Sequence, residues 1–469
     1  MHGNTEVIAR FVSELKYEDI PREVVERAKR QILDVIGVAL AGSTQEVGKI
    51  ALKFVERTGG TAECTVWGTK LRTSAPQAAF ANGIFCHATD YDDMWLPGAH
   101  PTGVTFPAAL AIAESLRASG RQLLVAQVAA YEITGKLHCC ADRRGGWHPT
   151  PVFGTFGATS AVGKLLRLDV PRLQIAFGIA SSEASGIGSH SGTMTKPFHS
   201  GHGARNGVVA AMLAADGFSA NPNVLDGAFF ETFYPDVSSE NWQLTATLGK
   251  PYHLAMPGIG IKMYPSGYHL HHTFEAALQL VKKHNIKTDQ IDSIELVVPR
   301  RGHFNRPNVR SGLEGKFSYQ YHVAMAILDQ KLTIESFHDE RALAVDVQQL
   351  LKKMSLRVDP SIPPNPDIVY ETVAIKLRDG KEVSAAEPLP RSHWRYPLSR
   401  DEWVGKFRDN AARVLKEPNI EKIIATVDKL DELSDVTALT ELIRLYVAGR
   451  SRQRIEGPHS DPLPEGEGI

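Results

Sequence analysis

Apolar residues recur at helical spacing along the first half of the chain. Near the N-terminus, one face of a predicted helix is formed by Val7, Ile8, Phe11, Val12 and Leu15. A second helix is expected to begin at Pro21, since proline suits a first helical position, and a third covers residues 46–57. Residues 64–67 form a short extended piece. From Ser74 onward the predicted helices are rich in alanine and glycine, and they cover residues 75–86, 108–116, 123–137, 154–166, 173–187 and 203–215.

The pattern changes after Tyr268. Residues 272–284 again predict a helix, but residues 291–298 have the composition of a strand. Residues 369–377 and 382–385 flank Asp379-Gly380 and predict a hairpin. Helical spacing returns at Ser399, a suitable N-cap. The predicted fold is therefore mostly α, with an all-helical domain over residues 1–268 and 400–450, an α+β lid domain over residues 269–399, and a disordered tail over residues 451–469.

Composition excludes several classes of partner. The chain has 469 residues, of which 43% are hydrophobic, and 52 lysines and arginines balance 53 aspartates and glutamates, so no nucleic-acid partner is expected. The N-terminus lacks a basic region followed by an apolar one, and no apolar run reaches the roughly 18 residues of a membrane span. Four cysteines, two of them adjacent, do not form a disulfide framework. We expect a cytoplasmic protein without membrane contact.

The densest group of titratable residues lies at 87–102, between two apolar runs. It contains three carboxylates and two imidazoles, Asp90, Asp92, Asp93, His87 and His100. Buried charge costs several kcal/mol unless it is paired, so these groups must either line a cleft or satisfy one another. A solvated loop is one alternative. A zinc or manganese site is another, but it rests on composition alone because the chain has neither an HExxH nor a CxxC motif.

Four further segments carry candidate chemistry. His148 precedes a helix with a glycine-rich start, where free N–H groups could hold an anion. Residues 193–205 are expected to link two helices, and a solvated loop explains their charges nearly as well as a site. Residues 262–269 lie at the predicted domain junction, where clefts commonly form. Tyr321 either presents its hydroxyl from the second domain or belongs to the core.

The missing motifs narrow the chemistry. The chain has no P-loop, no GxGxxG after a strand and no GxSxG nucleophile turn. The remaining histidines, lysines and acidic cluster suit proton transfer next to a carboxylate, because cations hold carboxylates and stabilise the enediolate-like charge that deprotonation creates. This chemistry needs neither a metal nor another cofactor.

Taken together, these segments resemble the 2-methylcitrate dehydratase / cis-aconitate decarboxylase family (MmgE/PrpD). The resemblance runs over roughly residues 5 to 450, and it is carried by the pattern HAxDxDD…HP at residues 87–101, Val66-Trp67-Gly68, Ala81-Asn82-Gly83, Phe153-Gly154-Thr155, Thr195-Lys196-Pro197, Lys262-Met263-Tyr264-Pro265 and Lys316-Phe317-Ser318 with Tyr321. It implies a helical domain with an α+β lid, a cleft between them, a homodimer, and cofactor-free lyase or isomerase chemistry on di- and tricarboxylates.

The resemblance also implies an active site. Its catalytic members would be Asp90, His100, His148, Lys196, Lys262 and Tyr321. We predict that either His100 or His148 removes a proton while the other assists loss of hydroxide, and that Asp90 orients a histidine. Lys196 and Lys262 would bind carboxylates, with Arg205 and His199 as further substrate-binding residues.

One position departs from the family pattern. Met94 stands where the family usually has threonine, so a thioether replaces a hydroxyl that could donate a hydrogen bond. Two alternatives remain for the polar residues near the domain junction: they replace the missing hydroxyl as hydrogen-bonding groups, or they lie on the surface. These residues are Ser266, His269, His271 and His272.

We therefore predict a hydro-lyase like 2-methylcitrate dehydratase. The same proton chemistry supports a cis-aconitate-type decarboxylase or an iminodisuccinate-type epimerase, and a catalytically silent carboxylate-binding protein is an alternative of another class.

Overall fold

The computed structural model describes residues 3–95, 98–141, 146–237, 245–299, 304–362, 371–386 and 395–445, together with residues 389, 391 and 393. The predicted disordered tail lies outside these residues. Two hydrophobic cores are present. One joins side chains between Ile8 and Ile259 with others between Val404 and Ile443, and the second joins side chains between Leu270 and Val383. We call the corresponding parts the helical unit (residues 3–259 and 400–443) and the α+β unit (residues 270–386).

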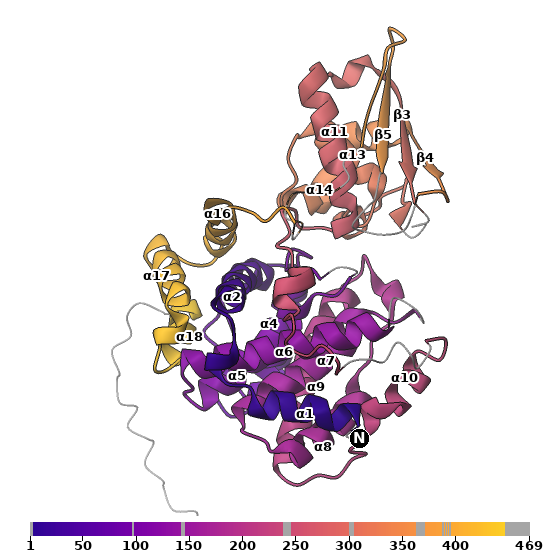
Figure 1. Ribbon diagram of the computed structural model, residues 1–469. Helices are drawn as coiled ribbons and strands as arrows, with labels where there is room; N and C mark the ends of the chain where they lie inside the picture. Colours follow the sequence, from indigo (N-terminus) through magenta and orange to yellow (C-terminus); the bar gives the residue numbers. More distant parts are fainter. Residues whose placement is uncertain are drawn as a thin grey trace, which may run out of the picture.

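The helical unit is a stack of helices (Figure 1). Its helices before the α+β unit are α1 (Asn4–Glu14), α2 (Arg22–Ser43), α3 (Glu46–Thr58), α4 (Ala75–His87), α5 (Pro101–Ser115), α6 (Gly120–Ala141), α7 (Pro149–Leu165), α8 (Val170–Glu183), α9 (Thr195–Ala215) and α10 (Ala228–Phe233). A small ribbon of β1 (Cys64–Thr65) and β2 (Arg72–Thr73) precedes α4.

Glycines bring α4 and α9 close together. A Cβ on Gly83 of α4 would lie 2.7 Å from the Cα of Gly201 in α9, a distance that no side chain tolerates. Helix α9 also packs on α7 and α5. This close packing fixes the C-terminal end of α4 beside the N-terminal ends of α5, α7 and α9, where the polar segments lie.

The α+β unit packs helices on a four-stranded sheet. Its elements are α11 (His271–His284), β3 (Ile291–Val298), α12 (Gly312–Gly315), α13 (Tyr319–Leu328), α14 (Asp339–Ala342), α15 (Val345–Leu351), β4 (Met354–Val358), β5 (Thr372–Leu377) and β6 (Glu382–Ala386). The strand order is β4-β3-β5-β6, and only the β3–β4 pair is parallel. Helix α11 packs on α13, β5 and β6. The predicted strand at 291–298 and the hairpin are confirmed.

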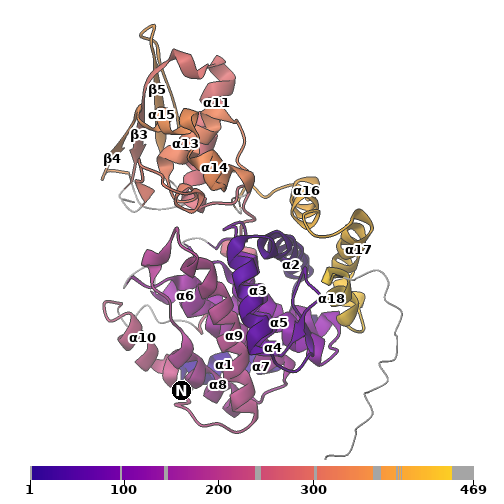
Figure 2. The same cartoon turned by 180° about the vertical axis from the view of Figure 1, so that it is seen from behind.

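The chain returns to the helical unit after the sheet. Figure 2 shows α16 (Arg400–Ala411), α17 (Glu417–Asp428) and α18 (Thr437–Ile443) on the side of the helical unit that carries α2. Ser399 caps α16 by accepting a hydrogen bond from the Glu402 N–H. The packing of α16 against α2 places the C-terminal helices in the larger core. The predicted domain limits themselves stay predictions.

Short turns of 3₁₀ helix connect these elements at Tyr17–Asp19, Gly188–His190, Val224–Asp226, Tyr268–Leu270, Thr288–Gln290, Glu335–Phe337 and Leu430–Glu432, with a π turn at Leu254–Gly258. The mostly-α fold class is confirmed. No helix in the described part of the chain is both long enough and apolar enough to span a membrane.

Three helices begin several residues earlier than predicted. Helices α5, α7 and α9 start at Pro101, Pro149 and Thr195, and not near residues 108, 154 and 203. Their first turns contain Pro, Thr, His and Lys, so apolar spacing does not reveal them. The prediction that residues 193–205 form a link is wrong, because residues 195–205 are the first turns of α9. The sequence pattern also predicted none of the elements β4, α10, α12, α13, α14 and α15.

Candidate active site

A small cavity lies where helix ends of the helical unit face the α+β unit. Its volume is about 200 Å³, which is below the range of drug-sized ligand pockets and suits a small metabolite. Its lining comes from both units and consists of Asp90, Met94, Gly98, His100, Trp147, His148, Pro149, Gly188, Ser191, Lys196, Lys262, Gly267, Tyr268, His269, Phe304 and Phe317. The wall therefore combines ammonium groups and imidazoles with aromatic rings, and the ammonium group of Lys196 lies 5.4 Å from the centre of the Phe317 ring.

Asp90 forms the centre of the charge network. Its backbone has φ of 54°, a left-handed conformation that is costly for residues other than glycine and that often marks functional sites. Its Oδ1 atom accepts hydrogen bonds from the ammonium groups of Lys196 at 2.7 Å and Lys262 at 3.1 Å. Burial alone would raise the pKa of Asp90, but the two lysines outweigh it and hold the pKa well below its usual range.

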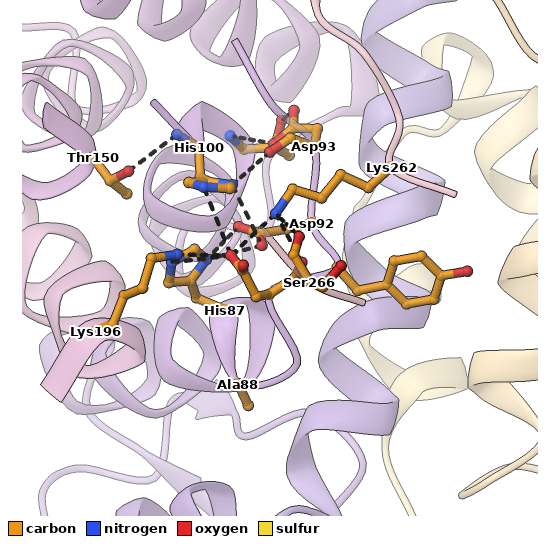
Figure 3. A network of polar contacts seen from close by, with 12 residues as sticks. His87, Ala88, Asp92, Asp93, His100, Thr150, Lys196, Lys262 and Ser266 are labelled. Atoms are coloured by element: carbon orange, nitrogen blue, oxygen red, sulfur yellow. Dashed lines mark hydrogen bonds and ion pairs between the residues drawn. The ribbon is translucent and has the colours of Figure 1, made fainter. Parts of the chain in front are cut away.

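The two lysines come from different segments and enter the network from opposite sides (Figure 3). Lys262 is fully buried and also donates to the carbonyl oxygens of Asp90 at 2.8 Å and Ser266 at 3.0 Å. Burial lowers the pKa of Lys262, although Asp90 opposes the effect. Lys196 also donates to His87 Nε2 at 2.7 Å.

His87 and Asp92 support Lys196 from behind. The Nδ1 atom of His87 lies 2.8 Å from Asp92 Oδ1, and both side chains are buried. Burial lowers the pKa of His87, so the ring is neutral at pH 7. Because Nε2 accepts from Lys196, the ring proton must be on Nδ1, and it is donated to Asp92.

His100 is the N-cap residue of α5, and one of its ring nitrogens is hydrogen-bonded within the protein. Its Nδ1 atom lies 2.8 Å from the carbonyl oxygen of Asp93, so Nδ1 carries the proton and Nε2 has the free lone pair. Its backbone N–H donates to Thr150 Oγ1 at 3.1 Å, which links the starts of α5 and α7. Burial, followed by repulsion from Lys262, holds the pKa of His100 well below its usual range. His100 is therefore a neutral base at pH 7.

His148 is the N-cap residue of α7 and lines the same cavity. Its Nδ1 atom lies 3.0 Å from His199 Nδ1, and its ring centroid is 6.2 Å from that of His87. Burial and the charge of Lys196 hold its pKa well below the usual value. The site thus contains at least three neutral imidazoles beside two ammonium groups.

A buried ion pair supports the loop that carries Asp90. Lys406 of α16 contacts Asp34 of α2 at 2.7 Å and donates to the carbonyl oxygen of Tyr91 at 2.8 Å. Asp93 has a different partner, because its carboxyl group accepts a hydrogen bond from the Thr102 hydroxyl. The loop that carries Asp90 is therefore held by α2, α5 and α16.

The geometry could place a metal ion only at one cluster of the described residues. Ligand atoms of His87, Asp90, Asp92 and His100 lie within 4.8 Å of one another. The ammonium groups of Lys196 and Lys262 already occupy Asp90 and His87 at 3.1 Å or less, so a divalent ion would meet two positive charges. The donor set does not fit a metal while these lysines are charged.

Comparison with known proteins identifies the family. The profile of the MmgE/PrpD N-terminal domain matches residues 6–243, and that of the MmgE/PrpD C-terminal domain matches residues 264–432. The chain belongs to the MmgE/PrpD family. The resemblance that the motifs indicated is thereby confirmed.

Members of the MmgE/PrpD family with named activities include two kinds of lyase. Cis-aconitate decarboxylases of Mus musculus and Homo sapiens are each 33% identical to this chain, and the matches cover 94% of it and 93–94% of the relatives. A 2-methylcitrate dehydratase of Escherichia coli strain K12 is 23% identical, over 92% of this chain and 95% of the relative. The identities favour the decarboxylase alternative over the dehydratase that the sequence first suggested.

The structure brings together five of the residues predicted from MmgE/PrpD resemblance, namely Asp90, His100, His148, Lys196 and Lys262. Asp90 makes its hydrogen bonds with the lysines, and its Oδ1 atom lies 3.8 Å from His100 Nε2. His87 is hydrogen-bonded to Asp92 and His100 to a backbone carbonyl, so the prediction that Asp90 orients a histidine stays a prediction.

Three other candidates lie outside the cavity lining. The ring of Tyr321 is buried in the core of the α+β unit and its hydroxyl donates to the Ser336 carbonyl, which is the core alternative. Arg205 is exposed on α9. His199 is buried behind His148 and contacts its ring. Ser266, His269, His271 and His272 are all buried, so their surface alternative is wrong, and His269 lines the cavity.

His87 belongs to the titratable group at 87–102 and Lys316 to a family motif, but the sequence pattern predicted a role in the site for neither residue. His87 opens the acidic motif, and its spacing of five residues from Asp92 at a helix end was a usable signal. Lys316 is 5% exposed, and its ammonium group interacts electrostatically with Asp90, Lys196 and Lys262. Nothing in the local sequence distinguishes Lys316 from a surface lysine.

Proposed function

We propose that this protein is a carboxy-lyase that decarboxylates a cis-aconitate-like tricarboxylate. The observation that carries the proposal is the meeting of two buried ammonium groups, Lys196 and Lys262, with the neutral imidazoles of His100 and His148 in one small cavity. The 33% identity to cis-aconitate decarboxylases supports this choice among the family's activities.

The proposed reaction needs an electron sink and a proton. The bond between the methylene carbon and its carboxylate breaks and releases CO₂, and its electron pair becomes a new carbon–carbon double bond. The pair of the old double bond then moves to the carbon beside a second carboxylate. Ammonium groups stabilise the resulting enediolate-like charge, and a histidine delivers a proton to that carbon. A trianion and one proton thus give a dianion and CO₂.

The cavity offers different groups to the carboxylates that remain and to the carboxylate that leaves. Lys196 and Lys262 are placed to bind the carboxylates that remain, with Asp90 holding the ammonium groups when substrate is absent. Phe304, an aromatic residue of the lining, would lie beside the carboxylate that leaves, whereas the ring of Phe317 lies under the Lys196 ammonium group. An apolar environment favours loss of the charged group as neutral CO₂.

One experiment separates this activity from its relatives. Purified protein is incubated with cis-aconitate, citrate, 2-methylcitrate and iminodisuccinate, while CO₂ and new alkene protons are followed together. Release of CO₂ from cis-aconitate with equal formation of a terminal =CH₂ group supports the proposal. Alkene formation from 2-methylcitrate without CO₂ would instead support a hydro-lyase, and catalytic silence with tight binding would support a carboxylate-binding protein.

A hydro-lyase acting on a methylated tricarboxylate is the second candidate because of Met94. Its side chain is 5% exposed and lines the cavity, and its backbone is fixed by paired hydrogen bonds with Gly260 at 2.9 and 3.0 Å. A thioether contacts a methyl group well but cannot bind a hydroxyl or carboxylate.

The homodimer also stays a proposal. Its support is a continuous aromatic contact from Phe54 through Phe80 to Phe198, of which the first and last are exposed by 36% and 38%. Exposed apolar patches mark interaction sites. Light scattering after gel filtration would test it, and a monomer of 51.4 kDa would refute it.

A further inference from the structure

A second imidazole stands directly behind His148 and has no role in the proposed reaction so far. The Nδ1 atoms of His148 and His199 are 3.0 Å apart, and their ring centroids are separated by 5.2 Å. We propose that His199 relays protons between solvent and His148 through this Nδ1–Nδ1 hydrogen bond. The inference rests on the proposed decarboxylation, in which each turnover consumes one proton in the cavity.

The hydrogen bond fixes the two rings in opposite tautomers. Only one proton can lie between two Nδ1 atoms, so one ring is the Nδ1–H tautomer and the other is the Nε2–H tautomer. Moving that proton from His199 to His148 allows the Nε2 proton of His148 to leave toward the cavity. A proton arriving at His199 Nε2 keeps that ring neutral, so protons and charge balance. The two rings have then exchanged tautomers, and the next turnover requires that they return to the first arrangement by ring rotation or by proton exchange.

Neither His87 nor His100, the other imidazoles of the charge network, has a second imidazole hydrogen-bonded to its Nδ1 atom. Through Nδ1, His87 is bonded to the carboxylate of Asp92 and His100 to the backbone carbonyl of Asp93. A carbonyl cannot supply a proton, and the Asp92–His87 pair is fully buried. Among the described residues, His148 is the cavity histidine whose Nδ1 meets a group able both to accept and to donate a proton.

His199 is 4% exposed, and its contacts on the side away from His148 are few. Its Nε2 atom makes no hydrogen bond with any described residue, and its ring meets that of His190 edge-on, with centroids 5.8 Å apart. His190 is only partly buried. The titratable groups that face His199 are His148, His190, His87, Lys196 and His202.

The surroundings of His199 disfavour its protonated, charged form, as expected of a ring that passes a proton on. Burial, followed by the repulsion of His190, His87, Lys196 and His202, lowers the pKa of His199 to about 4. A proton on His199 is therefore short-lived at neutral pH and is passed on. A group with this pKa would also bind substrate carboxylates poorly, which argues against the substrate-binding role that the sequence suggested.

The test compares His199→Asn with a matched control. Asparagine can keep a hydrogen bond to His148 Nδ1 but cannot carry a proton through its side chain. His202→Asn, three residues further along α9, changes a histidine that contacts Ser185 and Asn206 and not His148. Melting temperatures of both variants are measured first, and His199→Ala provides a second variant in which added imidazole can occupy the vacated space.

We expect His199→Asn to lower kcat roughly 10²-fold, the scale of general acid–base catalysis, while KM stays within about twofold. Its solvent deuterium isotope effect on kcat should rise above that of the wild type, and imidazole should restore His199→Ala. His202→Asn removes the smallest of the repulsions that act on His199 and leaves the Nδ1–Nδ1 hydrogen bond intact, so its kcat should stay close to that of the wild type. Unchanged kcat in His199→Asn, or a raised KM with normal kcat, would overturn the relay.

A measurement without substrate separates this inference from the proposed function. Histidine-selective ¹⁵N NMR of the full-length protein should show one of the two rings as the Nδ1–H tautomer and the other as Nε2–H, joined by one downfield proton that His199→Ala removes. Two rings in the same tautomer would overturn the relay whichever acid the enzyme converts. Absence of CO₂ release by the wild type, with the paired tautomers present, would overturn only the decarboxylation.

Discussion

Lys316 allows the electrostatics of the site to be tested through pH. Its ammonium group is buried, lies 3.5 Å from the Ala88 carbonyl oxygen, and has no carboxylate oxygen within 4.0 Å in the described part of the chain. Burial lowers its pKa from 10.5 to about 8, Asp90 opposes the shift, and Lys196 and Lys262 add to it. At pH 7 Lys316 is charged and adds to the positive potential of the cavity.

The expected pH profile follows from the sign of that shift. Above about pH 8 the free enzyme loses the Lys316 proton, whereas a bound tricarboxylate favours the charged form. We therefore expect kcat/KM to be constant from pH 6.5 to 7.5 and to fall by up to about tenfold per pH unit above pH 8, while kcat falls only at higher pH. Lys316→Arg keeps the charge and should remove this decline.

As the pH rises above 8, the stability of the folded protein should increase, whereas kcat/KM falls. The difference between 10.5 and about 8 corresponds to about 3 kcal/mol that the buried ammonium group costs the folded state. This cost is present in full below pH 8 and disappears as pH rises from 8 toward 10.5, because there the unfolded chain binds the proton and the folded chain does not. Lys316→Met should thus raise the melting temperature at pH 7 by several degrees and have less effect at pH 9.

The assays are steady-state kinetics from pH 6.5 to 9.5 and thermal unfolding at pH 7 and 9, each on wild type, Lys316→Arg and Lys316→Met. The expected pattern for Lys316→Met is lower kcat/KM with greater stability at pH 7. The reasoning is refuted if Lys316→Arg keeps a decline centred near pH 8, or if Lys316→Met melts several degrees lower at pH 7.

Three further predictions concern the support, the specificity and the metal independence of the site. Lys406→Met leaves Asp34 buried without its partner and should cost about 3–5 kcal/mol in thermal or denaturant unfolding; adding Asp34→Asn should recover most of the loss, and simple additivity would show that the two residues are not coupled. Met94→Thr should raise kcat/KM for cis-aconitate relative to 2-methylcitrate by about tenfold, the scale of one apolar contact, and an unchanged ratio would exclude Met94 from substrate contact. Chelator treatment should leave full activity, whereas loss that one divalent ion reverses would assign a metal to the cluster around Asp90.

The apolar pattern predicted the fold better than it predicted helix starts. Long periodic segments gave α1–α4, α6 and α11 within a few residues, since burial of an apolar face determines both the spacing and the helix. Helices α5, α7 and α9 start with polar turns whose side chains are buried by the site itself. Assigning polar residues to loops therefore gives the wrong result at these helix starts, as it did for residues 195–205 of α9.

The sequence predicted most residues of the site, but it predicted few of the contacts between them. The motif at 87–102 drew attention to Asp90 and His100, and the joint order of motifs added His148, Lys196 and Lys262. Contacts between Asp90 and lysines 106 and 172 residues away depend on how α4, α9 and the segment after Gly260 meet. Tyr321 and Arg205 failed as cavity residues for the same reason, because sequence order does not report which way a helix turns its side chains.

The three aspartates of one short loop show why residue type alone cannot assign roles. Lys196 and Lys262 hold the pKa of Asp90 well below its usual range, while burial beside Asp92 raises the pKa of Asp93 well above it, despite the hydrogen bond from Thr102. Asp90 is therefore a permanent anion that keeps two ammonium groups in a cavity. Asp93 favours its neutral form and serves as a structural link between the loop and α5. Opposite environments a few residues apart separate the functions of identical side chains, and the arrangement of α4, α5 and α9 creates those environments.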